Sequence, residues 1–173
     1  MKKLLAFLLL GFCLTGHAQK TVSITNTLPG ATVGVLEVQT TANGLAYPFY
    51  KSVNAVINVP VSTTTPPAAT FVLSNSNTSY FPFFSTGTIS YPIHMWNKIT
   101  GPGATPIPYG STVLNNATDA GTQFFYSIKL QIVIGGVTYT PTLSIYNYSV
   151  SGPGWTASYV VTGNTYTIKV KTP

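Results

Sequence analysis

The feature of this sequence that most constrains the fold is an alternating apolar pattern, interrupted by two adjacent glycines, between residues 124 and 146. Apolar side chains occupy every second position from Phe124 to Ile134, and the alternation resumes at Val137, directly after Gly135-Gly136. A period of two on both sides of a two-residue glycine turn is the signature of a β-hairpin. The sequence therefore predicts two antiparallel strands joined at this glycine pair.

The glycine turn also predicts which residues of the two strands face one another. From the turn outward, the predicted pairs are Ile134–Val137, Ile132–Tyr139, Ile128–Leu143 and Tyr126–Ile145. All of these pairs are expected on one face, because a slip of one residue would mix apolar with polar side chains. Pro141 would lie opposite Leu130 and has no N–H to donate, so we expect a bulge or a break in the ladder there.

Shorter alternating segments and turn residues recur along the rest of the chain. Strands are expected over residues 22–24, 32–40, 53–61, 71–73 and 89–93, with a loop over 101–110 and a final hairpin that turns at Gly163-Asn164. No window shows helical periodicity, and short strands separated by turns favour an all-β fold. We expect a single antiparallel β-sandwich, immunoglobulin-like or similar, of about 8–10 strands, with a small β-barrel as the alternative.

The first 18 residues have the pattern of a secretory signal peptide. Lys2 and Lys3 precede an apolar run that is too short to span a bilayer comfortably, and Gly16-His17-Ala18 places small residues at the positions that a signal peptidase requires. Cleavage is expected before Gln19. We therefore expect residues 1–18 to be removed, and the mature protein to be secreted or to lie at the surface or in the periplasm of a bacterium.

The remaining residues, 19–173, are expected to form one domain with very few ionisable groups. The only cysteine, Cys13, lies in the leader, so no disulfide is expected. Beyond the leader, Glu37 and Asp119 are the only acids, His94 is the only histidine, and arginine is absent. Two-carboxylate hydrolysis, a nucleophilic triad or a zinc site would each use nearly all of these residues. We expect no enzyme activity, no catalytic residues, no metal site and no cofactor, and the scattered lysines predict no nucleic-acid partner.

Three aromatic residues are the candidates for ligand binding. Trp96, Tyr109 and Trp155 lie in or beside segments rich in glycine and proline. Rings on the loops of a sandwich offer a large rigid contact area for sugar rings or partner proteins. The alternative is that these rings cap the ends of the core.

The expected function is therefore non-catalytic, either binding of a glycan or protein ligand or assembly at a surface. Two alternatives remain. The 124–146 hairpin has the length and the two-faced pattern of a pore-forming β-hairpin, so membrane contact is possible but not favoured. Uncharged strands with open edges are also typical of fimbria-like or filament subunits, which self-associate by strand addition.

Overall fold

The computed structural model describes residues 20–42, 45–53, 56–69, 93, 95–110 and 123–173, and the backbone of 71–74. The predicted leader, His94 and Asp119 lie outside this part of the chain. The predicted strand over 89–93 also lies outside it, except for Ile93, which is buried.

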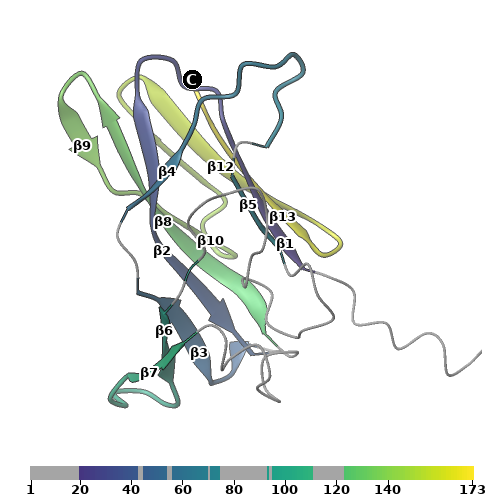
Figure 1. Ribbon diagram of the computed structural model, residues 1–173, viewed down its shortest axis with the longest axis vertical. Coiled ribbons are helices and arrows are strands. Elements are labelled where there is room, and N and C mark those ends of the chain that lie inside the picture. The colour runs from purple at the N-terminus through teal and green to yellow at the C-terminus, as the bar shows by residue number, and fades with distance from the viewer. Residues whose placement is uncertain are drawn as a thin grey trace, which may run out of the picture.

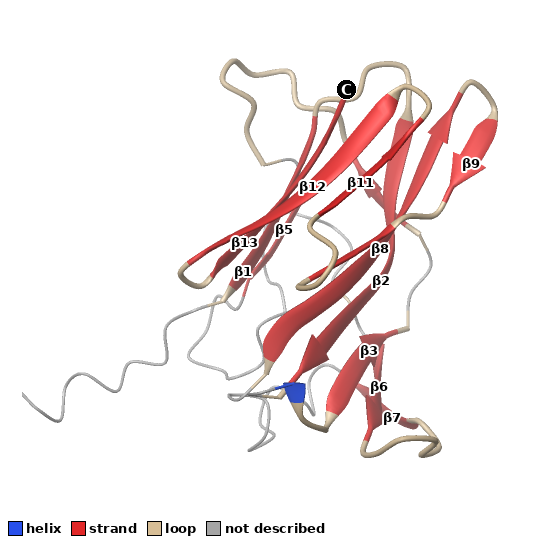
Figure 2. Cartoon of the chain, turned by 180° about the vertical axis from the view of Figure 1, so that it is seen from behind, coloured by secondary structure: helices blue, strands red, loops and turns tan. Residues whose placement is uncertain are grey.

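The described chain forms two β-sheets and no α-helix (Figures 1 and 2). One sheet has the strand order β11-β12-β13-β1-β5. The other has the order β10-β8-β2-β3-β6-β7, with β4 paired to β2 and β9 paired to β8. The strands are β1 (Thr21–Asn26), β2 (Thr32–Thr41), β3 (Phe49–Ser52), β4 (Ile57–Val59), β5 (Phe71–Ser74), β6 (Met95–Ile99), β7 (Ile107–Gly110), β8 (Phe124–Ile134), β9 (Val137–Tyr139), β10 (Thr142–Ser144), β11 (Ser149–Gly152), β12 (Trp155–Thr162) and β13 (Thr165–Lys171).

The prediction of an all-β, mostly antiparallel fold is confirmed. Two sheets that do not close into a barrel are consistent with a β-sandwich. One pairing is parallel, because β1 runs alongside β13 from Thr21 opposite Thr165 to Asn26 opposite Val170. The described residues contain more strands than expected, in part because the return strand of the hairpin is split into β9 and β10.

The register of the central hairpin is confirmed on both sides of the glycine turn. Ile134 faces Val137 and Ile128 faces Leu143. The ladder breaks at Pro141, as expected: β9 ends at Tyr139 and β10 begins at Thr142. The C-terminal hairpin likewise has its predicted pairs, Val161 with Tyr166 and Tyr159 with Ile168.

A β-bulge at Tyr126 overturns one part of the hairpin prediction. The pairing of β2 with β8 passes from Gln39 opposite Ser127 to Thr40 opposite Phe125, which leaves Tyr126 as an additional residue on β8. A bulge shifts the alternation of the strand by one position. As a result Phe125 is buried, and Tyr126 is only half-buried and lies apart from the apolar face that contains Ile128.

Two other predicted segments differ from the structure. The strand expected over 53–61 is confirmed for Ile57–Val59, which form β4, and is wrong at its ends, because β3 ends at Ser52 and Val53 and Val61 are exposed. The loop expected over 101–110 ends early, because residues 107–110 form β7. This strand tolerates Pro108 because it lies at the edge of its sheet.

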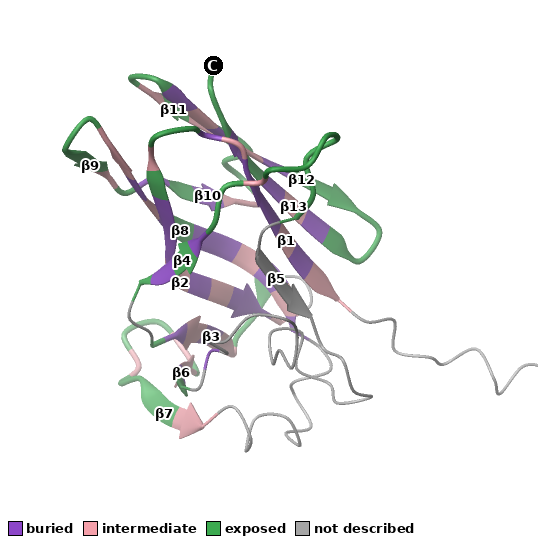
Figure 3. Ribbon diagram, turned by 45° about the horizontal axis from the view of Figure 1, so that its top comes forward, coloured by how far each residue is buried: buried purple, intermediate pink, exposed green. Residues whose placement is uncertain are grey.

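Aromatic rings and one buried polar side chain connect the two sheets. Phe125 of β8 lies 5.3 Å, between ring centroids, from both Tyr159 of β12 and Tyr166 of β13. Asn26 is buried at the end of β1, where its Nδ2 donates to Val59 O at 3.0 Å and its Oδ1 accepts from Leu28 N at 3.0 Å. Figure 3 shows buried segments on β1, β2, β8 and β13.

Candidate functional site

The two predicted tryptophans lie on strands and not on loops. Trp96 is fully buried in β6, and Trp155 is 3% exposed at the start of β12. Trp155 packs so closely over the preceding turn that a Cβ at Gly152 would lie 2.6 Å from its indole. Neither indole is open to solvent, because both tryptophans belong to the hydrophobic core.

Tyr109 lies in β7, opposite Trp96 of β6, and is half-buried against the core. Trp155 belongs to the other sheet. The structure therefore brings Trp96 and Tyr109 together as cross-strand neighbours and does not gather the three predicted residues into one site.

Four other rings are in successive contact, and we call them the aromatic row: Tyr47, Phe49, Tyr126 and Tyr146. Successive ring centroids are 4.7 Å apart for Tyr47–Phe49, 5.6 Å for Phe49–Tyr126 and 6.4 Å for Tyr126–Tyr146. Tyr47 is 39% exposed and Tyr146 is 68% exposed, while the two inner rings are half-buried. The row therefore presents aromatic surface to solvent from β3, from β8 and from the turn after β10.

Tyr146, the most exposed ring of the row, lies in a turn that is closed by side-chain hydrogen bonds. Ser144 Oγ accepts hydrogen bonds from the backbone N–H groups of Tyr146 at 3.2 Å and Asn147 at 3.1 Å. Asn147 Nδ2 donates to Thr142 O at 3.1 Å and so closes the turn from the other side. A side chain that is presented by such a turn loses less conformational freedom when it binds a ligand.

Three charged residues lie beside the row, one glutamate and two lysines. On β3, Phe49 and Lys51 lie two residues apart and so point to the same face of the strand. Lys51 Nζ lies 2.7 Å from Glu37 Oε2 on β2. Lys129 of β8 is the register partner of Glu37 and is exposed. The neighbourhood of the row is therefore polar and has only a small net positive charge.

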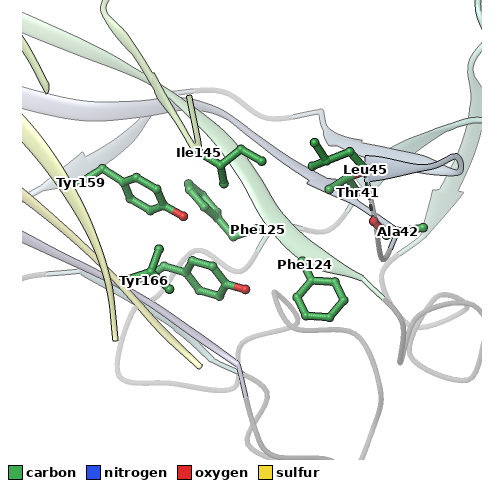
Figure 4. A pocket seen from close by; sticks show the side chains of 9 residues that line it. Thr41, Ala42, Leu45, Phe124, Phe125, Ile145, Tyr159 and Tyr166 are labelled. Carbon is green, nitrogen blue, oxygen red and sulfur yellow. Dashed lines mark hydrogen bonds between the residues drawn. The ribbon is translucent and has the colours of Figure 1, made fainter. Parts of the chain in front are cut away.

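A second feature is a cleft of about 230 Å³ that lies where the two sheets meet. It is lined by Thr41, Ala42, Leu45, Phe124, Phe125, Ile145, Tyr159, Val161 and Tyr166 (Figure 4). The rings of Tyr159 and Tyr166 are stacked, with an interplanar angle of 4° and centroids 6.4 Å apart. In Figure 4 both hydroxyl groups point toward the side of the cleft that carries Phe124 and Phe125.

The surroundings of the two cleft tyrosines raise the pKa of each hydroxyl above its ordinary value. Burial is the main cause that raises the pKa of Tyr159, and the neighbouring Tyr166 and Tyr148 raise it further. Burial also raises the pKa of Tyr166, against the opposing effect of a backbone hydrogen bond from Phe125. Beside the cleft, Lys20 Nζ donates to Gln123 O and lies 3.9 Å from the ring centroid of Phe124. Burial lowers the pKa of Lys20.

Sequence reasoning missed the aromatic row and the cleft, although each had a signal. Phe124-Phe125-Tyr126 places three aromatic residues in succession, and a regular strand cannot direct all three toward one core. Ser144 and Asn147 flank Tyr146 in the arrangement of a hydroxyl-stabilised turn.

Within the described ranges, no group of three histidine, cysteine or acidic residues is arranged to hold a metal ion. No helix of the described chain is long and apolar enough to cross a membrane. Comparison with protein-family models, with curated proteins and with solved structures finds no match.

Proposed function

We propose that this protein is an exported, non-catalytic binding protein that holds a neutral glycan chain on the aromatic row. The observation that carries the proposal is the succession of four rings in contact from Tyr47 to Tyr146, of which the first and the last are exposed. The predicted leader over residues 1–18 supports export.

The chemistry of the row suits a sugar. One face of a sugar ring carries C–H groups that pack on an aromatic ring, while its hydroxyl groups require polar partners. Tyrosine combines an apolar ring with a polar hydroxyl, and three of the four rings in the row are tyrosines. The Glu37–Lys51 ion pair and Asn147 supply further polar groups beside the rings. The small net charge beside the row, one glutamate against two lysines, favours a neutral chain over a strongly charged one.

The size of the row favours a glycan over a protein partner. A stable protein interface buries roughly 800 Å² on each partner. Four side chains, of which two are half-buried, provide much less than this area. A chain of sugar units needs a much smaller contact area, which four rings in successive contact supply.

The non-catalytic part of the proposal rests on the acidic residues. Glu37 is the only acid in the described chain, and it is held by Lys51 at 2.7 Å. Glycoside hydrolysis uses two carboxyl groups on opposite sides of the scissile bond. A ligand that lies along the row therefore contacts aromatic rings and one ion pair, and the described residues offer it no second side-chain carboxyl group for hydrolysis.

The test is affinity electrophoresis of the purified protein in gels that contain neutral polysaccharides, such as β-glucan, xyloglucan, galactomannan and soluble starch. We expect at least one of them to retard the protein, and Tyr146→Ala or Tyr47→Ala to weaken that binding about tenfold, as for other aromatic anchors. Tyr148→Ala is the matched control, because Tyr148 is also exposed but stacks on Tyr159 outside the row. Migration that no polysaccharide changes, or equal losses in Tyr146→Ala and Tyr148→Ala, would contradict the proposal.

A second candidate function, self-assembly by strand addition, is favoured by the edge strand β11. This strand ends its sheet, and its sequence Ser149-Val150-Ser151-Gly152 contains neither a charged residue nor a proline to block pairing. In sedimentation velocity experiments we expect the mean sedimentation coefficient to rise with protein concentration. Ser151→Lys should suppress this rise, whereas Thr138→Lys, on β9, should not. A monomer at all concentrations would rule out this second function.

A further inference from the structure

The cleft between the sheets is distinct from the aromatic row. The turn at the end of β10 separates the two features, because Ile145 lines the cleft while the next residue, Tyr146, belongs to the row. An argument about the cleft therefore does not depend on the proposed glycan function.

The volume of the cleft sets the size of what it can hold. Pockets for drug-sized ligands measure roughly 300–1,000 Å³, and an apolar cavity of about 150 Å³ is sufficient for benzene. At about 230 Å³ the cleft lies between these limits. It therefore has room for one ring with a small substituent, or for a short acyl chain.

The lining of the cleft is aromatic and aliphatic, with one unusual polar group. Tyr159 is only 2% exposed, and its hydroxyl has no hydrogen-bond partner in the described protein. Its ring lines the cleft, and Figure 4 shows the hydroxyl directed toward Phe125. A buried hydroxyl without a partner is costly, by about 1–3 kcal/mol, so a ligand atom that accepts its hydrogen bond gains affinity.

The rim of the cleft contains a backbone conformation that is rare for its residue type. Leu45 has φ +62°, in the left-handed region, and its side chain is partly exposed beside the cleft. The turn that holds it is closed by hydrogen bonds from Leu45 N to Ala42 O and from Ala42 N to Ala46 O, each 3.1 Å long. Strain of this kind in a non-glycine residue is concentrated at functional sites, where the surrounding structure maintains it.

We infer that the cleft is a binding site for a small, mainly apolar molecule that bears one hydrogen-bond acceptor, which receives the proton of the Tyr159 hydroxyl. The apolar body of the ligand packs between Phe124 and Phe125 on one sheet and Val161 and Tyr166 on the other. The Tyr159 hydroxyl is protonated across the neutral range, as any tyrosine is, and burial raises its pKa further, so it acts as a donor.

Two adjacent valines provide a matched test of the location. Val161 lines the cleft, and Val160, the next residue of β12, points to the opposite face of the strand. The substitution Val161→Phe fills the cleft, whereas Val160→Phe adds the same volume outside it. If Val161→Phe does not fold, Ala42→Leu fills the cleft from β2's side and takes its place.

The probes are acetophenone, which carries a carbonyl acceptor, and ethylbenzene, which has a similar shape without one. We expect both to shift amide resonances of cleft residues in the ¹⁵N-labelled protein, with acetophenone bound about five- to tenfold more tightly, as one added hydrogen bond implies. Tyr159→Phe should abolish this preference and leave ethylbenzene binding unchanged, and Val161→Phe should abolish binding of both probes. The inference is overturned if neither probe binds the wild-type protein, if the preference persists in Tyr159→Phe, or if Val160→Phe reduces binding as much as Val161→Phe.

Discussion

The stacked pair Tyr159 and Tyr166 predicts that two identical substitutions will change stability in opposite directions. Both rings are buried and line the same cleft, with centroids 6.4 Å apart. The hydroxyl of Tyr159 has no hydrogen-bond partner in the described protein, whereas that of Tyr166 takes part in a backbone hydrogen bond with Phe125. We therefore expect Tyr159→Phe to stabilise the protein and Tyr166→Phe to destabilise it.

The magnitude follows from the environment of each hydroxyl. An unsatisfied buried hydroxyl costs about 1–3 kcal/mol, and the dispersion attraction of a single oxygen atom to its neighbours offsets only a few tenths of a kcal/mol of this cost. Phenylalanine retains the ring, so the stacking on Tyr148 and the contact with Phe125 remain. Tyr159→Phe should raise the free energy of unfolding by about 1 kcal/mol, while Tyr166→Phe should lower it by about 1 kcal/mol through the lost hydrogen bond.

The assay is equilibrium unfolding in urea, in which a change of midpoint at constant slope reports a change of stability. A difference of about 1 kcal/mol also shifts the melting temperature of a domain of this size by about 2–4 °C. If Tyr159→Phe destabilises the protein as much as Tyr166→Phe does, the hydroxyl of Tyr159 has a partner and the reasoning about the cleft fails.

Three other features of the structure can be tested by measurements of stability and mobility. In urea titrations, Gly152→Ala should lower the free energy of unfolding by about 1–3 kcal/mol, because the added Cβ would lie 2.6 Å from the Trp155 indole. The control is Gly101→Ala, in the other Gly-Pro-Gly segment, which should be nearly neutral because nothing lies within 4 Å of its added Cβ. Stability should fall as the pH rises above about 10. The pKa values of Tyr159 and Tyr166 are raised in the folded state, so the unfolded chain loses these protons first. Urea titrations at a series of pH values should show that Tyr159→Phe loses less stability at alkaline pH than the wild-type protein does. Ser144→Ala removes the oxygen that accepts hydrogen bonds from the N–H groups of Tyr146 and Asn147. It should therefore increase the backbone mobility of residues 145–147 in ¹⁵N relaxation measurements and weaken glycan binding severalfold. Unchanged relaxation would show that the turn does not depend on Ser144.

The parts of the fold that local patterns determine were predictable from the sequence. The glycine turn and the alternation beyond it are sufficient to pair Ile134 with Val137 and Ile128 with Leu143, and a proline without an N–H is sufficient to place the break at Pro141. These features depend only on residues within the hairpin.

The parts that depend on a distant strand were not predictable. The bulge at Tyr126 is defined by the pairing of β8 with β2, about 85 residues earlier in the chain, and it changes which aromatic residues reach the core. The alternation from Val53 to Val61 resembles one strand, but the ladder with β2 covers Ile57–Val59, and Val53 and Val61 are exposed. A similar limit applies to the predicted site. Glycine and proline indicate a turn, but they do not show whether the aromatic side chain that follows faces the core or the solvent. Trp155 follows such a turn and faces the core.

The measurement that addresses the proposed function most directly is an NMR titration of the protein, labelled with ¹³C in its tyrosine rings, with a polysaccharide that retards it in the gel. The aromatic row predicts that the ring resonances of Tyr47, Tyr126 and Tyr146 shift with ligand concentration, while those of Tyr109 and Tyr148 do not. Shifts that are confined to Tyr109 and Tyr148, with the three row tyrosines unchanged, would place the ligand elsewhere and contradict the proposed glycan site.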